Sequence, residues 1–178
     1  MTTLISHPLP VLAVGLALGS RQIPPRLLLA GLLSACLPDA DVLAFQLGIA
    51  YADAFGHRGF SHSLLFAAGC GLFGALGSRW LGCGPLKPGL WVGLACASHG
   101  LLDALTNGGL DVAFFWPWDA QRYFLPWRPI VVSPFIGNFF GPRGVQVLLS
   151  EARWVWAPCA GLALSGVGLR ALLRRRPN

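Results

Sequence analysis

The sequence predicts an all-helical protein embedded in a membrane, a polytopic bundle of about five transmembrane helices with one proline- and tryptophan-rich interfacial segment. Composition is the first observation: 54% of the 178 residues are hydrophobic and 11% are charged, with a mean hydropathy of +0.61. Soluble domains carry roughly 25% charged residues. The second observation is a set of long apolar runs, and the third is a one-sided distribution of basic residues. The length favours a single domain over residues 1–178.

Three apolar runs reach or nearly reach the roughly 17 to 25 residues that a helix needs to cross a membrane, and they cover about 63–82, 88–106 and 154–173. Two shorter runs, about 4–19 and 27–37, flank the turn-forming Pro24 and Pro25 and are expected to be helices packed within the bundle. No basic stretch precedes the first run and no A-x-A site follows it. Residues 1–20 are therefore expected to be retained rather than cleaved as a signal peptide.

Two further segments are expected near the membrane surface. Residues 42–55 are apolar but short and interrupted by Gly48, which favours a re-entrant or interfacial helix. Residues 107–153 mix prolines with aromatic residues, as suits an irregular segment at the level of the lipid headgroups. The five cysteines show no C-x-x-C spacing and lie mostly in apolar runs, so we expect small hydrophobic residues rather than ligands or disulfides.

Basic residues predict the orientation. With five crossings, one side of the membrane carries eight basic residues and no acid: Arg21, Arg26, Arg79, Lys87, Arg170, Arg174, Arg175 and Arg176. The positive-inside rule makes this the cytoplasmic side and includes the C-terminus. The net charge of +6 is thereby explained by topology, and no nucleic-acid-binding signature accompanies it, so we expect no direct binding of nucleic acid.

The histidines and several aspartates fall at the opposite, outer face. Each lies at the outer end of an expected helix or in an outer loop: His7, Asp39, Asp41, His57, His62, His99 and Asp103. Ionisable groups near membrane depth are costly and are usually functional. Imidazole and carboxylate groups are ligands of divalent cations. The sequence therefore predicts a metal site at the lipid–water boundary.

Three short motifs carry these residues. In "SHGLLD", His99 and Asp103 are four apart and share one helix face. In "PDAD", an extended turn after a helix-ending proline can aim the carboxylates of Asp39 and Asp41 the same way, or let one bridge two metals. In "HRGFSH", His57 and His62 do not share a helix face.

A bend in "HRGFSH" is expected to bring its two histidines together. Gly59 is the residue expected to make the bend. Ser61 is expected to be the N-cap of the following helix.

Taken singly, each residue also has a structural interpretation. The pair His99 and Asp103 could form an interhelical hydrogen bond, the "PDAD" carboxylates could cap a helix, and His62 and His7 could be ordinary interfacial or exposed residues. Asp53 is expected to be solvated. All four histidines together with three carboxylates at one face favour the metal site over these separate explanations.

Other polar residues have two interpretations each. Arg58 could clamp an anionic substrate oxygen or pair with an aspartate or a lipid headgroup. Thr106 and Asn107 could orient Asp103, or simply end the helix. Glu151 could be a ligand, a general base or a boundary charge. Three arginines of the aromatic segment could bind phosphate or extend towards lipid headgroups: Arg122, Arg128 and Arg143.

The motifs "LPDADVLAF", "GHRGFSHSLLFA" and "SHGLLDALTNGG", in this order after "SHPLPVLAVGLALGS", closely resemble the bacterial inner-membrane metal-dependent hydrolases, also described as LexA-binding, inner membrane-associated hydrolases. The similarity covers essentially the whole chain. The resemblance implies a multi-pass inner-membrane protein with a divalent metal site, a hydrolase activity, and LexA as a protein partner.

That family is distantly similar to zinc-dependent phospholipases C, which are soluble, secreted helical enzymes. By this likeness, six residues match zinc ligand positions, with Asp41 as a bridging or supporting carboxylate: His7, Asp39, His57, His62, His99 and Asp103.

The expected function is a zinc-dependent phosphoesterase that acts on a lipid or another membrane-associated phosphoester. Arg58 would neutralise developing charge, and Asp41 or Asp39 would accept a proton. The alternative is an inner-membrane anchor or regulator with a structural metal. In both cases the C-terminus is expected in the cytoplasm and the site on the periplasmic side.

Overall fold

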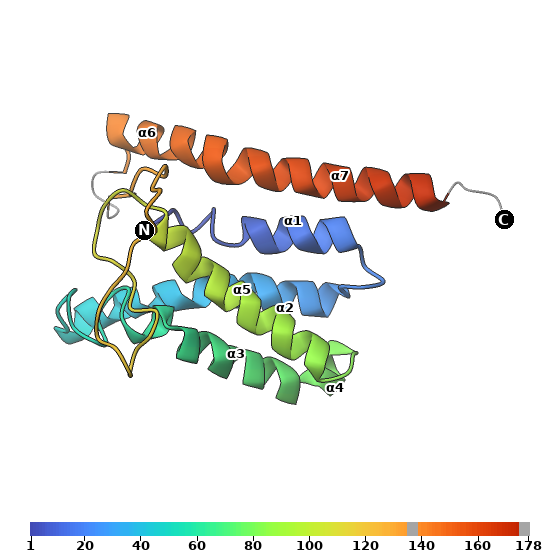
Figure 1. Cartoon of the computed structure of the whole chain (residues 1–178), viewed down its shortest axis with the longest axis horizontal. Helices are drawn as coiled ribbons and strands as arrows, with labels where there is room; N and C mark the ends of the chain where they lie inside the picture. Colours follow the sequence, from blue (N-terminus) through green and yellow to red (C-terminus); the bar gives the residue numbers. More distant parts are fainter. Residues whose placement is uncertain (135–138, 175–178) are drawn as a thin grey trace.

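The computed structural model describes residues 1–134 and 139–174, and within these ranges the chain is helical and contains no strand, as expected. Helices α1 (Leu9–Leu18), α2 (Pro25–Cys36), α3 (Leu64–Leu76) and α5 (Leu86–Ala104) form a bundle, and α4 (Ser78–Leu81) is a short turn between α3 and α5. Helix α7 (Ala157–Arg174) lies along α1, and α6 (Pro142–Glu151) precedes α7 in the chain. Figure 1 shows the irregular segments gathered at one end of the bundle, near the N-terminus, and the C-terminus at the other end.

Two helical segments are long and apolar enough to cross a membrane within the described ranges: Pro25–Leu47, of 23 residues, and Pro142–Arg174, of 33 residues. Of the three runs expected to cross, 154–173 lies within one of these two segments, and the five expected crossings are not confirmed. The run 63–82 is divided between α3, which has 13 residues, and the short α4, while the short run 27–37 belongs to one of the two long segments.

The first long segment continues beyond α2 as a 3₁₀ helix, η1 (Leu37–Leu47). Pro38 does not end the helix because it is the second residue of η1, where a missing N–H costs no intrahelical bond. The chain leaves η1 at Gly48, which has a left-handed φ of 75°. The helix expected over 42–55 therefore extends only to Leu47, and the extended turn expected at Asp39 and Asp41 is wrong, because both residues lie in η1.

The second long segment begins before the expected span. Residues 107–134 are irregular, as predicted, with isolated bridges between Thr106 and Ile130 and between Val112 and Tyr123. Helix α6 nevertheless starts at Pro142, because proline is favoured at the first helical position. A π-helical turn, η4 (Ala152–Trp156), joins α6 to α7.

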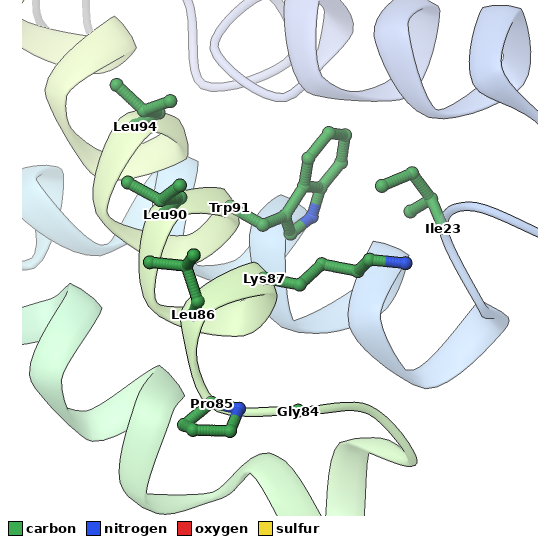
Figure 2. Close-up of a pocket in the computed structure, with 8 residues that line it drawn as sticks. All are labelled: Ile23, Gly84, Pro85, Leu86, Lys87, Leu90, Trp91 and Leu94. Carbon is green, nitrogen blue, oxygen red and sulfur yellow. The ribbon is translucent and has the colours of Figure 1, made fainter.

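Close helix contacts hold the bundle together. Helices α3 and α5 approach so closely that a Cβ on Gly71 would lie 2.8 Å from the Gly89 carbonyl oxygen. Trp91 of α5 packs against all three clusters of buried apolar residues. Figure 2 shows Trp91 and Lys87 projecting from α5 towards Ile23, beside an apolar hollow of about 610 Å³.

The outside of the bundle is strongly apolar. Helix α7 has no buried residue, and Leu164 is 73% exposed. On α3, Phe73 is 76% exposed. Large exposed apolar surfaces of this kind mark contact with a membrane or another protein.

The predicted cytoplasmic basic residues lie away from the N-terminal end. Arg21, Arg170 and Arg174 surround one small hollow between the α1–α2 turn and the end of α7. The Arg170 guanidinium donates hydrogen bonds to the carbonyl oxygens of Leu16 and Ala17, at the end of α1. Arg175 and Arg176, which also entered the charge count, lie outside the described residues.

Candidate metal centre

The structure brings the seven sequence-predicted residues together at the N-terminal end of the bundle. They come from the segment before α1, from η1, from the 3₁₀ turn η2 (Phe60–His62) and the loop before it, and from the last turns of α5. Their side chains are at most 5% exposed. The donor atoms fall into two groups, and within each group all of them lie within 4.8 Å of one another. One group is His7, Asp39, His99 and Asp103, and the other is Asp39, His57 and His62.

Asp39 is the carboxylate that the two groups share. Its oxygens lie 3.3 Å from His99 Nε2 and 3.6 Å from His7 Nε2. Neither oxygen has a hydrogen-bond partner among the described residues, although both are buried. A buried carboxylate without hydrogen bonds is costly, and pairing with a charge or a metal removes that cost.

One ring nitrogen of His99 faces one ring nitrogen of His62. The Nδ1 atom of His99 lies 2.7 Å from the Ala35 carbonyl oxygen, which can only accept, so Nδ1 carries a proton, and Nε2 presents a lone pair when the ring is neutral. His62 directs Nδ1 towards Asp41, at 3.2 Å. The two Nε2 atoms are 3.1 Å apart. Two lone pairs at this distance repel each other unless a proton or a metal ion lies between them.

Asp41 orients the histidines of the second group. Its carboxylate lies 2.6 Å from His57 Nδ1 and accepts hydrogen bonds from the Ser61 hydroxyl at 2.7 Å and the Arg58 backbone N–H at 3.2 Å. Carboxylates that hold a histidine Nδ1–H in this way fix the ring and leave Nε2 for a metal. Of the two expected roles for Asp41, the contacts favour the supporting one.

The loop that carries His57 and His62 bends differently from the prediction. Arg58, not Gly59, has the left-handed backbone, with φ of 63°. Gly59 is required for a close approach instead, because a Cβ there would lie 2.2 Å from the Ala54 carbonyl oxygen. The N-cap of α3 is Ser63, whose hydroxyl accepts from Phe66 N–H, so the assignment of Ser61 as N-cap was wrong.

Arg58 is fully buried, and its contacts favour pairing with an aspartate over contact with substrate. Its Nε donates to Asp103 at 2.9 Å and Nη2 donates to the Thr106 hydroxyl at 3.0 Å. Nη1 donates to the carbonyl oxygens of Gly108 and Leu110. The guanidinium thereby fixes Asp103 beside the cluster.

His7 reaches the cluster from the N-terminal segment. Its ring stacks on His99, with centroids 3.5 Å apart, and its Nε2 lies 2.6 Å from the Thr2 hydroxyl. The backbone N–H of Thr2 donates to Asp103 at 2.9 Å. Burial, together with the neighbouring His99, lowers the pKa of His7 to about 3, so this imidazole is neutral at pH 7.

Electrostatics of the cluster favour a cation. Burial disfavours protonation of His62, but its hydrogen bonds to Asp103 and Asp41 outweigh this and raise the pKa of His62. Three carboxylates face one guanidinium here, so the cluster carries two negative charges when the imidazoles are neutral. Nitrogen and oxygen donors in this number suit one or two divalent ions such as Zn²⁺.

Glu151 does not join the cluster. It is fully buried and accepts hydrogen bonds from the Thr3 backbone, the Thr3 hydroxyl and the Ser6 hydroxyl, at 2.5 to 2.7 Å. Trp156 also donates to the Ser6 hydroxyl. Glu151 therefore anchors the segment that carries His7, a role that sequence reasoning missed because nothing local pairs residues 3 and 151.

The remaining candidate residues lie around the cluster. Arg122 donates to three backbone carbonyl oxygens, those of His57, Ala52 and Asp53. Arg128 stacks over Phe124, and Arg143 reaches the Val132 carbonyl oxygen. Asn107 accepts from Val132 N–H.

Asp53 is exposed, as expected, and accepts from Phe55 N–H. Thr2 and Ser61 were missed as partners of the predicted ligands. The serine next to His62 in "HRGFSH" was the one signal available for them.

Comparison with known proteins places these features in a family. Residues 1–176 match the family described as YdjM inner membrane protein. The chain is 47% identical over 169 residues to the inner membrane protein YbcI of Escherichia coli (strain K12), which covers 94% of this chain and 96% of that protein. No solved structure matches. The apolar exterior, the long helices and these matches agree, and the chain belongs to the YdjM family of inner membrane proteins.

Proposed function

We propose that this protein is a metal-dependent hydrolase of the inner membrane, a phosphoesterase that acts on a lipid or another membrane-associated phosphoester. The observation that carries the proposal is the pair of facing nitrogens, His62 Nε2 and His99 Nε2, 3.1 Å apart beside a buried carboxylate, Asp39, that has no hydrogen-bond partner among the described residues. This arrangement is unfavourable as a purely structural hydrogen-bond network and favourable around a cation.

Each donor group has a distinct composition. His7, Asp39, His99 and Asp103 offer four donors, which can surround one tetrahedral ion. The group of Asp39, His57 and His62 offers three, which leaves room for a further ligand, as catalytic zinc sites do. When bound, a divalent ion supplies Lewis acidity to a phosphoryl oxygen and acidifies water.

The protein's own residues hold the donor side chains in place and orient them. Asp41 keeps His57 and His62 in their ring orientations, and Arg58 keeps Asp103 in place. Asp39 is a member of both donor groups, and it also lines a hollow beside them. It is therefore the carboxylate placed to accept a proton from an attacking water.

The membrane arrangement is part of the proposal. Helices α1, α2, α3, α5 and the α6–α7 segment alternate in direction (Figure 1), so all the donor residues meet at one end. Arg21, Lys87, Arg170 and Arg174 lie at the other. The positive-inside rule then puts the C-terminus in the cytoplasm and the donor cluster on the periplasmic side of a multi-pass protein.

A second candidate function is an inner-membrane anchor or regulator with a structural metal, and LexA is the partner that the resemblance suggests. The four-donor group favours it, because closed four-ligand coordination is typical of structural zinc. The three-donor group favours catalysis. The two functions therefore differ in what they require of His57 and His62.

The test is metal analysis combined with activity. Protein purified in detergent is measured for bound metal and assayed against phosphodiesters and phosphomonoesters, both lipid and generic. The hydrolase proposal expects bound zinc and an activity that His57→Ala abolishes while most of the metal of the four-donor group stays. Stoichiometric metal with no phosphoester cleavage in the panel would overturn the hydrolase and leave the structural metal.

A further inference from the structure

An apolar hollow of about 630 Å³ lies directly beside the donor cluster. Its walls come from the N-terminal segment, the end of α2, η1 and the segments before α6. Most of the lining is apolar and includes Leu4, Ile5, Val42, Pro134, Phe139 and Phe140. The volume is in the range of sites that bury a small organic ligand, roughly 300–1,000 Å³.

The hollow and the cluster share Asp39. This residue is 6% exposed and lines the hollow, and its two oxygens lack hydrogen bonds among the described residues. The other polar groups of the lining are small: Thr2, Thr3 and Ser133 beside the Met1 backbone. The hollow of Figure 2 differs, because among the described residues that line it Lys87 is the only charged one and none is acidic. The hollow at Asp39 therefore combines a cation-binding carboxylate with apolar walls.

Apolar side chains surround the opening. Phe140 is 88% exposed, Ile5 63% and Leu4 55%. Exposed apolar groups around a ligand opening are unfavourable in water, but they are compatible with the edge of the hydrocarbon layer, where an amphiphile can enter with its chain first.

We propose that this hollow binds the hydrocarbon chain of an amphiphilic phosphoester whose phosphate group lies at the Asp39 cluster. The inference rests on the proposed function and adds the substrate class: a lipid-like phosphoester recognised by its chain as well as by its phosphate. The match is one of charge and polarity, because metal-loaded donors attract the anionic head and the adjoining walls bury the chain.

The experiment uses alkylphosphonates, which cannot be hydrolysed at the P–C bond, with chains of one, six and twelve carbons. The full-length protein, zinc-loaded in nanodiscs, is titrated with each. A dodecylphosphonate with a mid-chain diazirine is then photo-crosslinked and the labelled peptides are mapped. Both measurements are independent of turnover.

Two substitutions separate binding in the hollow from general partition into lipid. Ile5→Trp adds bulk to the lining, and Leu43→Trp adds the same group at a residue of similar exposure, 58%, outside the hollow. We expect Ile5→Trp to weaken dodecylphosphonate binding about tenfold and to leave methylphosphonate binding unchanged. Leu43→Trp should change neither. Zinc content of both variants confirms that the cluster is intact, and Leu4→Trp is a second variant if Ile5→Trp does not fold.

Crosslinks at Ile5, Val42 or Phe139 that Ile5→Trp removes would support the inference. Three results would overturn it: labels spread over α3 and α7 alike, equal chain-length dependence in Ile5→Trp and wild type, or a protein–protein crosslink in the hollow that shows a second copy as the occupant. Hydrolysis of generic phosphoesters with no chain preference would overturn the inference and leave the hydrolase. Chain binding in the hollow without any hydrolysis would overturn the hydrolase instead.

Discussion

His62 Nε2 and His99 Nε2 lie 3.1 Å apart in the protein interior, each with its other ring nitrogen held by an oxygen acceptor. The tautomers follow from the acceptors, since the Ala35 carbonyl cannot donate and Asp41 is a carboxylate. Two neutral imidazoles so fixed cannot donate to each other. This relationship links the hydrogen bonds around the cluster to the cation proposed within it.

Replacement of His99 should release metal. His99→Gln removes the nitrogen that faces His62 and Asp39, so we expect metal affinity to fall by more than the 10–100-fold that supporting residues contribute. Elemental analysis after dialysis against a weak chelator measures the metal that each variant retains. Ser98→Ala is the control, because the neighbouring Ser98 bonds only the Ala95 carbonyl. Equal metal content in both variants would contradict the assignment of His99.

Asp41→Asn should weaken metal binding without abolishing it. The amide cannot hold His57 and His62 as the carboxylate does, so we expect a 10–100-fold loss of affinity, measured by competition with a coloured chelator. Asp53→Asn, at an exposed aspartate of the neighbouring loop, should have no effect. A larger loss than for His99→Gln would instead make Asp41 a direct ligand.

Arg58→Asn should destabilise the fold. Asparagine tolerates the left-handed backbone of this position, so the substitution tests the guanidinium rather than the bend. Loss of one partner from a buried ion pair typically costs about 3–5 kcal/mol, and we expect a lower midpoint of thermal unfolding in metal-free detergent solution. Arg21→Asn, at an exposed arginine, should leave the midpoint unchanged. An unchanged midpoint in Arg58→Asn would mean that Asp103 does not need its partner.

Acid should destabilise the metal-free protein through His7. The folded pKa of about 3 lies below the ordinary value of 6.5, so the unfolded state binds more protons between these values. The contribution of neutral His7 is complete above pH 6.5 and is lost as pH falls towards 3, by at most about 1.4 kcal/mol per pH unit.

Unfolding midpoints of wild type and His7→Asn in chelator, between pH 7.5 and 5, measure this effect. Their difference isolates His7 from His62, whose pKa is raised and whose contribution has the opposite sign. Parallel profiles for the two proteins would show that His7 titrates normally.

The sequence was sufficient to predict a helical membrane protein and to select the polar residues that gather at one end. In a chain with 11% charged residues, buried imidazoles and carboxylates stand out, and alternating helices bring their outer ends together. These signals depend on composition and on the order of helices, which do not require exact boundaries.

Local geometry was less predictable. Propensity placed the bend at Gly59, but the left-handed backbone is that of Arg58, whose guanidinium is buried. Proline suggested a helix end at Pro38, yet the first turn of η1 tolerates it. The anchoring of Thr3 by Glu151 joins residues 148 positions apart, and no pattern in the sequence connects them.

The α6–α7 segment is held by two polar groups, Glu151 at the end of α6 to the N-terminal segment and Arg170 of α7 to the last carbonyls of α1, with exposed leucines between them. Hydrocarbon tails are as apolar as leucine, so the exposed leucines of α7 do not favour one sliding position of α7 along α1 over another. Those two polar attachments set the register of the longest helical segment, and through it the height at which His7 meets its neighbours.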